Sequence, residues 1–288
     1  MKIKGYYHIF VLFSVGVWGA TFVSTKVLLN NGLNPSEIFV LRFSLAYLLI
    51  SVIAPKKLLA DSKKDELLFI CAGLTGGSLY FLAENTALRI TLASNVSLII
   101  CTTPLITALC SHYLVKGERL RKKFVYGSLI ALTGVAFVVF NGHFILKINP
   151  LGDLLTIAAA LMWALYNVVL KRLDKRYSTV FVTRKVFAYG LLTILPVFIF
   201  EPFDIAADVF LRPAVIVNIL FLGVIASMLC FIIWNIAVKN IGVVRSSNYL
   251  YLTPIVTLIT SYAVINEPVT PIAMLGAGLI IGGVCLAK

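Results

Sequence analysis

Residues 81–111 read FLAENTALRITLASNVSLIICTTPLITALCS, and residues 231–261 read FIIWNIAVKNIGVVRSSNYLYLTPIVTLITS. Aligned without a gap at an offset of 150, the two segments share eight residues. The identical pairs are Phe81/Phe231, Asn85/Asn235, Ala87/Ala237, Ser97/Ser247, Thr103/Thr253, Pro104/Pro254, Thr107/Thr257 and Ser111/Ser261. The shared residues include asparagine, threonine and proline in the same order, so a chance match between apolar segments is a poor explanation. The chain therefore contains an internal repeat.

The repeat extends over most of the chain, with small changes of offset. Further pairs are Trp18/Trp163, Lys26/Lys171, Arg42/Arg184, Glu118/Glu267, Gly127/Gly276 and Gly134/Gly283. We expect a first repeat over residues 1–145 and a second over residues 146–288.

The composition excludes a soluble globular protein. Hydrophobic residues make up 60% of the 288 residues and charged residues 13%, whereas soluble domains are about 45–50% apolar and about 25% charged. Mean hydropathy is +0.99. A membrane-spanning helix needs ~20 apolar residues, and the hydropathy pattern predicts ten of them, so the fold class is an all-α polytopic membrane protein. The predicted spans are 6–29, 35–54, 66–86, 92–114, 122–140, 151–171, 179–200, 213–238, 244–264 and 270–287.

Lysine and arginine are distributed unevenly between the predicted loops. Eighteen lie in the loops and termini on the side of the N-terminus, and three lie in the loops on the other side. Since cytoplasmic loops collect these residues, both termini are predicted to be cytoplasmic, in a cell (inner or plasma) membrane. This distribution explains the net charge of +13 without a nucleic-acid partner.

Each predicted repeat contains five spans. Because five is an odd number, the second repeat enters the membrane from the opposite side. Such inverted repeats are common in secondary transporters, where the binding site lies near the bilayer midplane between the repeats.

In each half, a polar span is followed by a mid-span proline and by an acidic residue at the end of that segment. These residues are Asn85, Thr103, Pro104 and Glu118 in the first half and Asn235, Thr253, Pro254 and Glu267 in the second. With Trp18 near the middle of the first span, the pattern resembles the EamA-type exporters of the drug/metabolite transporter superfamily, over nearly the whole chain. The resemblance implies export of amino acids, other metabolites or drugs. It also implies a central cavity lined by the first four helices of each repeat, with the fifth and tenth helices packed outside.

Charged residues within a span need a reason, because each costs ~2.5–3.5 kcal/mol at mid-helix on insertion scales. Glu84 is interpreted as a substrate-binding residue and a proton-coupling candidate, or as a structural partner of Arg42. Arg42 is a candidate for binding a substrate carboxylate. Its repeat mate Arg184, beside Lys185, is expected to extend towards the lipid headgroups.

Aromatic and amide side chains complete the predicted binding site. Trp18 and Trp163 lie near mid-span, away from the interfaces where tryptophan usually gathers. Tyr166 and Asn167 share one helical face with Trp163, because they follow it by three and four residues. The other candidates for substrate binding are Tyr80, Asn85, Asn235 and Tyr249. For each of these residues, packing or interhelical hydrogen bonding is the alternative interpretation.

Prolines and glycines are expected to shape the helices. Pro104 and Pro254 each free a backbone carbonyl within the membrane and are predicted kinks or hinges. The pair Gly278/Gly282 on the last span allows close helix approach, either within the monomer or in a homodimer.

The motifs of the main alternative class, an embedded enzyme, are absent from the sequence. It has no HExxH, GxSxG or P-loop motif, and its three histidines are isolated. We therefore expect no enzyme activity, no cofactor and no metal. The favoured function is secondary active export of a small amphipathic metabolite such as an amino acid by alternating access, with proton exchange as one form of coupling. The alternatives are a sugar-phosphate or nucleotide-sugar exchanger and, from another class, a membrane channel or scaffold.

Overall fold

The computed structural model describes residues 5–54, 57–91, 93–115, 121–140, 149–173, 176–265 and 269–287, and the side chains of 93–95 and 260–265 are not described. Within these residues the secondary structure is helical, with no strand. Glu118 and Glu267, part of the repeated pattern, lie outside the described residues. The all-α prediction is confirmed.

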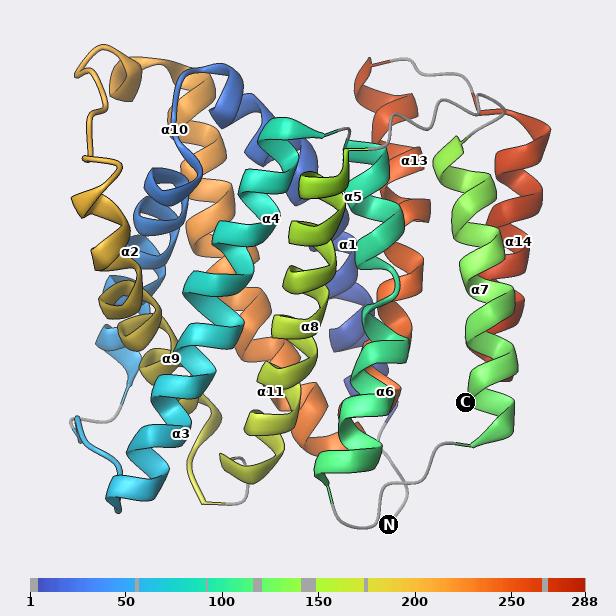
Figure 1. Ribbon diagram of the computed structural model, residues 1–288, viewed down its shortest axis with the longest axis horizontal. Helices are drawn as coiled ribbons and strands as arrows, with labels where there is room; N and C mark the ends of the chain where they lie inside the picture. The colour runs from blue at the N-terminus through green and yellow to red at the C-terminus, as the bar shows by residue number, and fades with distance from the viewer. Residues whose placement is uncertain are drawn as a thin grey trace.

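The helices run up and down through one bundle (Figure 1). The α-helices are α1 (Tyr6–Asn30), α2 (Pro35–Ile53), α3 (Lys63–Gly73), α4 (Leu79–Ile90), α5 (Ala93–Ile100), α6 (Thr103–Leu114), α7 (Lys122–Phe140), α8 (Pro150–Leu173), α9 (Thr179–Ile194), α10 (Pro213–Leu220), α11 (Cys230–Ile241), α12 (Val243–Asn248), α13 (Thr253–Ile265) and α14 (Pro271–Leu286). Short π-helical segments are η1 (Leu74–Ser78) and η4 (Phe221–Leu229), and 3₁₀ segments are η2 (Leu195–Ile199), η3 (Val209–Leu211) and η5 (Tyr249–Leu252). We call the end at which α1, α3 and α9 begin the lower end, as it is drawn in Figure 1.

Eight helical segments among the described residues are long and apolar enough to cross a membrane. They are Tyr6–Asn30, Pro35–Ile53, Lys63–Ile90, Val96–Leu114, Lys122–Phe140, Pro150–Leu173, Thr179–Ile199 and Pro213–Ile241. The predicted ninth span is divided into α12, η5 and α13, and the tenth, α14, has 16 residues, fewer than the ~20 that a span needs. The polytopic prediction is thus confirmed for eight spans, and ten spans stay a prediction.

Local sequence explains where several helices begin. Pro35 stands in the first turn of α2, where its missing N–H costs nothing, and the Glu37 carboxylate accepts a hydrogen bond from the backbone N–H of Asn34 at 2.7 Å. Both predicted kink prolines stand at the second residue of a helix, Pro104 in α6 and Pro254 in α13. The α-helical structure is interrupted just before each proline. A turn at residues 101–102 precedes α6, and the 3₁₀ segment η5 precedes α13. A hinge motion at these breaks stays a prediction.

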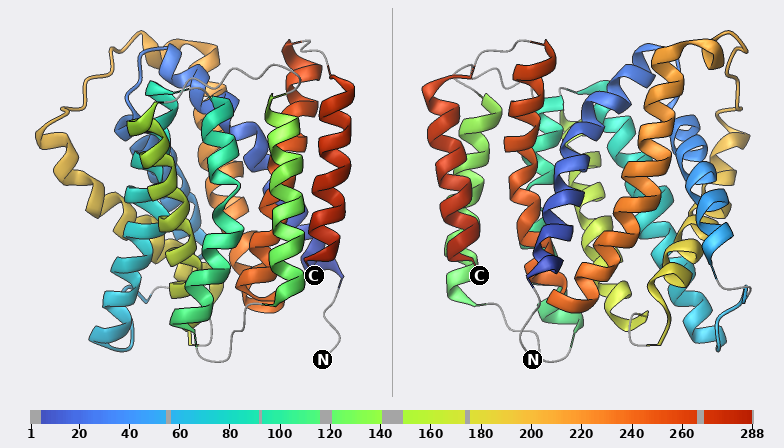
Figure 2. Two further views of the ribbon diagram at one scale, coloured as in Figure 1. Left: turned by 45° about the vertical axis from the view of Figure 1, so that its right-hand side comes forward. Right: turned by 180° about the vertical axis from the view of Figure 1, so that it is seen from behind.

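Helices α7 and α14 lie side by side at one edge of the bundle (Figures 1 and 2). Their contact is built from glycines, since a Cβ added at Gly134 would stand 2.5 Å from the carbonyl oxygen of Gly276, and one at Gly283 would stand 2.5 Å from that of Gly127. By contrast, a Cβ at Gly278 or Gly282 would meet nothing within 4 Å. The close approach within the monomer therefore uses Gly276 and Gly283, and a homodimer through Gly278/Gly282 stays a prediction.

Candidate functional site

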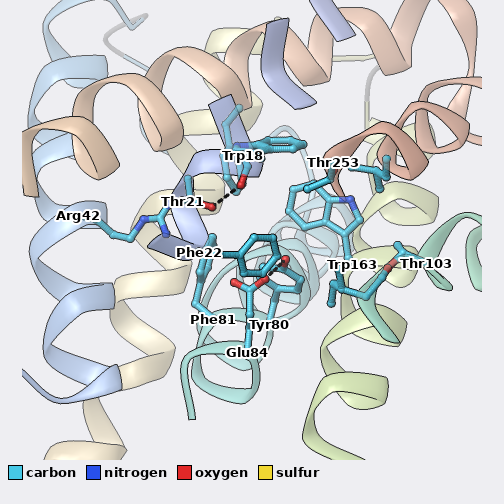
Figure 3. A pocket seen from close by; sticks show the side chains of 13 residues that line it. Trp18, Thr21, Phe22, Arg42, Tyr80, Phe81, Glu84, Thr103, Trp163 and Thr253 are labelled. Atoms are coloured by element: carbon cyan, nitrogen blue, oxygen red, sulfur yellow. Dashed lines mark hydrogen bonds between the residues drawn. The ribbon is translucent and has the colours of Figure 1, made fainter. Parts of the chain in front are cut away.

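A small cavity lies in the middle of the bundle, between helices from both halves of the chain (Figure 3). Its volume is about 60 Å³, enough for water molecules and well below the ~300 Å³ of pockets that enclose drug-sized ligands. The lining side chains are Trp18, Thr21, Phe22, Arg42, Tyr80, Phe81, Glu84, Ile100, Thr103, Trp163, Phe231, Leu250 and Thr253. A larger ligand can enter only if these side chains move apart.

Six of the lining residues form identical pairs of the sequence repeat. Both members of three identical pairs line the cavity, namely Trp18/Trp163, Phe81/Phe231 and Thr103/Thr253. The two tryptophan rings stand edge to face with centroids 5.3 Å apart. The cavity therefore lies where equivalent surfaces of the two repeats meet.

The charged part of the lining comes from the first half alone. Glu84 on α4 is 8% exposed and accepts a hydrogen bond from the Tyr80 hydroxyl at 2.7 Å. Arg42 on α2 is 3% exposed, and its Nε donates to the Ser227 hydroxyl at 2.8 Å. Its guanidinium lies 4.4 Å from the centroid of the Phe81 ring. Among the described residues no ion pair joins Arg42 to Glu84, so both charges remain available to a ligand.

The two tryptophans differ in hydrogen bonding. The Trp18 indole N–H donates to the carbonyl of Ala226 at 3.0 Å. The buried Trp163 indole N–H has no partner among the described residues. An unsatisfied buried donor costs ~1–3 kcal/mol, so this group favours a state in which a ligand or water accepts from it.

Five of the ten predicted binding residues line the cavity, and five do not. Trp18, Arg42, Tyr80, Glu84 and Trp163 belong to the first set. Asn85, Tyr166, Asn167, Asn235 and Tyr249 belong to the second, and their role in binding stays a prediction.

The residues outside the lining make hydrogen bonds that hold helices together. Tyr166 donates to Asn235, which donates in turn to Thr183, at 2.9 Å each. The indole N–H of Trp234 donates to Asn167 at 3.0 Å. These buried bonds join α8, α9 and α11 directly below the cavity.

Asn85 and Tyr249 make their contacts further away. The Asn85 amide donates to the backbone carbonyl of Pro35 at 3.3 Å, which fastens α4 to the start of α2. The Tyr249 hydroxyl is 2.7 Å from Nδ1 of His8, near the lower end.

A second group of buried charges lies at the lower end, between α3 and α9. Lys185 is 6% exposed; it forms an ion pair with Glu66 and donates to the carbonyl of Leu58 at 3.0 Å. The Tyr189 hydroxyl also donates to Glu66. Arg184 is 5% exposed and donates to the carbonyl of Lys57. We call Glu66, Arg184, Lys185 and Tyr189 the lower-end charge cluster.

This cluster corrects the expectation that Arg184 and Lys185 extend towards headgroups. The loop before α3 folds over the start of α9. Arg184 therefore donates to the carbonyl of Lys57, and Lys185 donates to the carbonyl of Leu58 and pairs with Glu66. The span Lys63–Ile90 begins three residues before the predicted span 66–86, whose first residue is Glu66.

Sequence reasoning missed several lining residues, among them Phe81 and Phe231. Their signal was present, because they form one of the identical pairs of the repeat. Thr21 and Phe22 on α1 had no comparable signal, since only the approach of the helices places them beside the cavity.

Comparison with protein families finds a match to the EamA-like transporter family over residues 5–140 and again over residues 150–287. An uncharacterized transporter of Archaeoglobus fulgidus is 28% identical, over 97% of this chain and 96% of its own. A probable terminal-alkyne amino-acid exporter of Streptantibioticus cattleyicolor is 26% identical, over 96% of this chain and 91% of its own. A probable amino-acid metabolite efflux pump of Escherichia coli is also 26% identical, over 96% and 92% respectively.

The chain also resembles a protein of known crystal structure, with a TM-score of 0.79 and 19% sequence identity. The similarity covers 99% of this chain and 97% of the other. At this identity it supports the fold alone.

Proposed function

We propose, from the premise that the chain belongs to the EamA-like transporter family, that it exports a small amphipathic metabolite such as an amino acid. The chain is a multi-pass membrane transporter and not an enzyme. The proposal for the substrate rests on the central cavity, in which a carboxylate and a guanidinium face an aromatic lining. The names of two relatives, an amino-acid exporter and an amino-acid metabolite efflux pump, agree with it.

The cavity offers complementary groups to each part of an amino acid. Glu84 can accept from an ammonium group, and Arg42 can donate to a carboxylate. The face of an aromatic ring attracts a cation as well, and Trp18, Trp163 and Phe231 provide such faces. The unpaired Trp163 N–H adds one donor.

Transport would proceed by alternating access between two inverted repeats. Support comes from α7 and α14, where Gly134 meets Gly276 while Gly127 meets Gly283. Since Gly276 is the repeat mate of Gly127 and Gly283 that of Gly134, the contacts are reciprocal, as a two-fold relation between the halves requires. In this scheme the lower-end charge cluster holds the predicted cytoplasmic side closed, and its ion pair separates when that side opens.

Glu84 is the group through which we propose proton coupling. Acidic side chains inside membrane proteins commonly relay protons, and Glu84 contacts the cavity and a hydroxyl donor at once. Protonation would remove its attraction for an ammonium group. Substrate and proton would then compete for the same carboxylate, as exchange requires.

A sugar-phosphate or nucleotide-sugar exchanger is less well supported. A phosphate needs several cationic donors, and Arg42 is the one cationic side chain that lines the cavity among the described residues.

Counterflow in proteoliposomes tests the substrate class. Vesicles loaded with an unlabelled amino-acid mixture should accumulate labelled amino acid, and vesicles loaded with hexose phosphates should not. Trp163→Phe should raise the half-saturation concentration about tenfold, because it removes the unpaired N–H. Trp234→Phe is the matched control, since its N–H is bonded to Asn167 outside the cavity lining. Exchange of hexose phosphate alone would overturn the proposal.

A further inference from the structure

The π-helical segment η4 bonds to two residues that line the central cavity, although none of its own residues lines that cavity. The Trp18 indole N–H donates to the carbonyl of Ala226 at 3.0 Å, and the Arg42 Nε donates to the Ser227 hydroxyl at 2.8 Å. Ala226 and Ser227 are both fully buried. Because π-helical segments are rare and occur frequently at functional sites, η4 is a candidate for positioning the binding site from outside it.

Two contacts fix the plane of the Arg42 guanidinium. Its Nε donates to Ser227, and its central carbon lies 4.4 Å from the centroid of the Phe81 ring. Since a guanidinium is planar and rigid, fixing Nε also fixes the direction of the terminal N–H groups. Among the described residues, the guanidinium makes no other hydrogen bond or ion pair. The edge that carries both terminal nitrogens therefore remains for a ligand in the cavity (Figure 3).

Comparison of the two repeats connects the Ser227 hydroxyl with the arginine of the cavity. At the offset of 150, η1 of the first half corresponds to residues 224–228 of η4, and Gly77 stands where Ser227 stands. Glycine has no hydroxyl, and the repeat mate of Arg42, Arg184, donates to a backbone carbonyl at the lower end. Of the two equivalent segments, the one that receives the cavity arginine is thus the one that carries the hydroxyl.

We propose that Ser227 is a positioning residue that makes Arg42 selective for a substrate carboxylate. Because Ser227 occupies Nε, a carboxylate binds end-on, with one oxygen on each terminal nitrogen. Bidentate pairs of this kind combine strength with geometric specificity. A carboxamide offers one oxygen and an NH₂ group, so it cannot form the pair. The inference rests on the proposed export of an amino acid, and it adds which part of that substrate the site selects.

Competition between amino acids and their α-carboxamides in proteoliposomes tests this role. Vesicles loaded with unlabelled amino acids are given an equimolar mixture of isotope-labelled amino acids and the corresponding amides. Mass spectrometry then gives the ratio of acid to amide taken up, with protein-free vesicles as the background. The wild-type protein should prefer the acid about tenfold or more, and Ser227→Ala should lower the ratio about tenfold, because Arg42 loses the hydrogen bond that orients it. Loss of folded protein alone would lower both uptakes and leave their ratio unchanged.

Ser78→Ala is the matched control. Ser78 lies in η1 and is 2% exposed, and its hydroxyl is 2.7 Å from that of Thr193, which does not line the cavity. This variant removes a buried, hydrogen-bonded hydroxyl of the equivalent segment and should keep the wild-type ratio. Ser227→Cys is the second variant if Ser227→Ala does not fold. Because a thiol is a weaker acceptor than a hydroxyl, it should lower the ratio about threefold.

The outcomes separate this inference from the proposed function. A wild-type ratio in Ser227→Ala or in Ser227→Cys, or an equal fall in Ser78→Ala, would overturn the positioning role and leave amino-acid export in place. Equal uptake of acids and amides by the wild-type protein would overturn the selection of a carboxylate. A wild-type protein that takes up no amino acid would overturn the proposed substrate, and this inference with it.

Discussion

Replacing Glu66 by glutamine should loosen the lower end while leaving the central cavity intact. Glu66 receives hydrogen bonds from Lys185, Tyr189 and the backbone N–H of Ala60, the last at 2.7 Å. Its side chain is 20% exposed and that of Lys185 is 7% exposed. The substitution leaves the lysine charge buried without its counter-ion.

The size of the effect follows from what Lys185 retains. Breaking a buried ion pair by removing one partner costs ~3–5 kcal/mol. After Glu66→Gln, the ammonium still donates to the carbonyl of Leu58 at 3.0 Å and lies 4.8 Å from the centroid of the Tyr189 ring. The glutamine oxygen can still accept from Ala60. We therefore expect a loss of about 2 kcal/mol in local stability, below the full range for a buried pair, or roughly a 30-fold shift in the opening equilibrium.

Hydrogen exchange measured by mass spectrometry detects this opening, because amide exchange reports local unfolding free energies. Peptides covering residues 57–73 and 179–189 should exchange roughly 30-fold faster in the variant, and peptides of α7 and α14 should be unchanged. Arg176→Gln is the control, since the Arg176 side chain is 64% exposed and Asp65 keeps the hydrogen bond from the Tyr177 hydroxyl. It should change exchange by less than about fivefold. Wild-type exchange rates in Glu66→Gln would refute the structural role of the cluster.

Two further substitutions separate packing from binding. Gly134→Leu should lower the stability of the protein in detergent by ~1–3 kcal/mol, because its Cβ would meet the backbone of Gly276. Gly278→Leu is the control, since a Cβ at this position meets open space and should not change the stability. Equal melting temperatures of the two variants would contradict the glycine contact. Asn235→Leu should destabilise the protein by ~1 kcal/mol or more, because it removes the buried hydrogen bonds that Asn235 makes with the Tyr166 hydroxyl and with Thr183. Its half-saturation concentration for substrate should be unchanged at a temperature where it is folded, and a rise in that concentration would restore Asn235 to the binding site.

Hydropathy predicted the helices well because a membrane span depends on local composition. The eight spans found in the structure match predicted ones to within a few residues, and Trp18 and Trp163, which were predicted binding residues near mid-span, line the cavity. The positions of the spans depend on residues that are close together in the sequence, so they can be predicted from the sequence alone.

Polar residues inside the bundle were harder to assign, since their role depends on what a neighbouring helix presents. Asn235 and Asn167 are of a residue type that is expected in a binding site, yet each makes a hydrogen bond to an aromatic side chain of another helix. The sequence predicts that Lys185 lies at the membrane interface, whereas in the structure it donates a hydrogen bond to the carbonyl of Leu58 in the 57–61 loop. Partners distant in sequence decide these cases, and no local pattern encodes them.

The sequence repeat indicated some of the cavity residues, but it did not predict where every pair of equivalent residues lies. Three identical pairs line the cavity, whereas Arg42 lines it and its mate Arg184 bonds to the backbone of Lys57 at the lower end. An inverted repeat brings mates together only near its axis, so a residue away from the axis has to be assigned from its own contacts.

The most direct test of the account measures protons and substrate in the same vesicles. Proteoliposomes loaded with substrate and a pH-sensitive dye should acidify when substrate leaves in exchange for protons, and wild-type protein should show both movements. Glu84→Gln should still exchange labelled for unlabelled substrate in counterflow, with a raised half-saturation concentration because its amide oxygen accepts from the ammonium group without a charge, but its lumen should not acidify. Acidification by Glu84→Gln at the wild-type rate would contradict the claim that this carboxylate couples transport to protons.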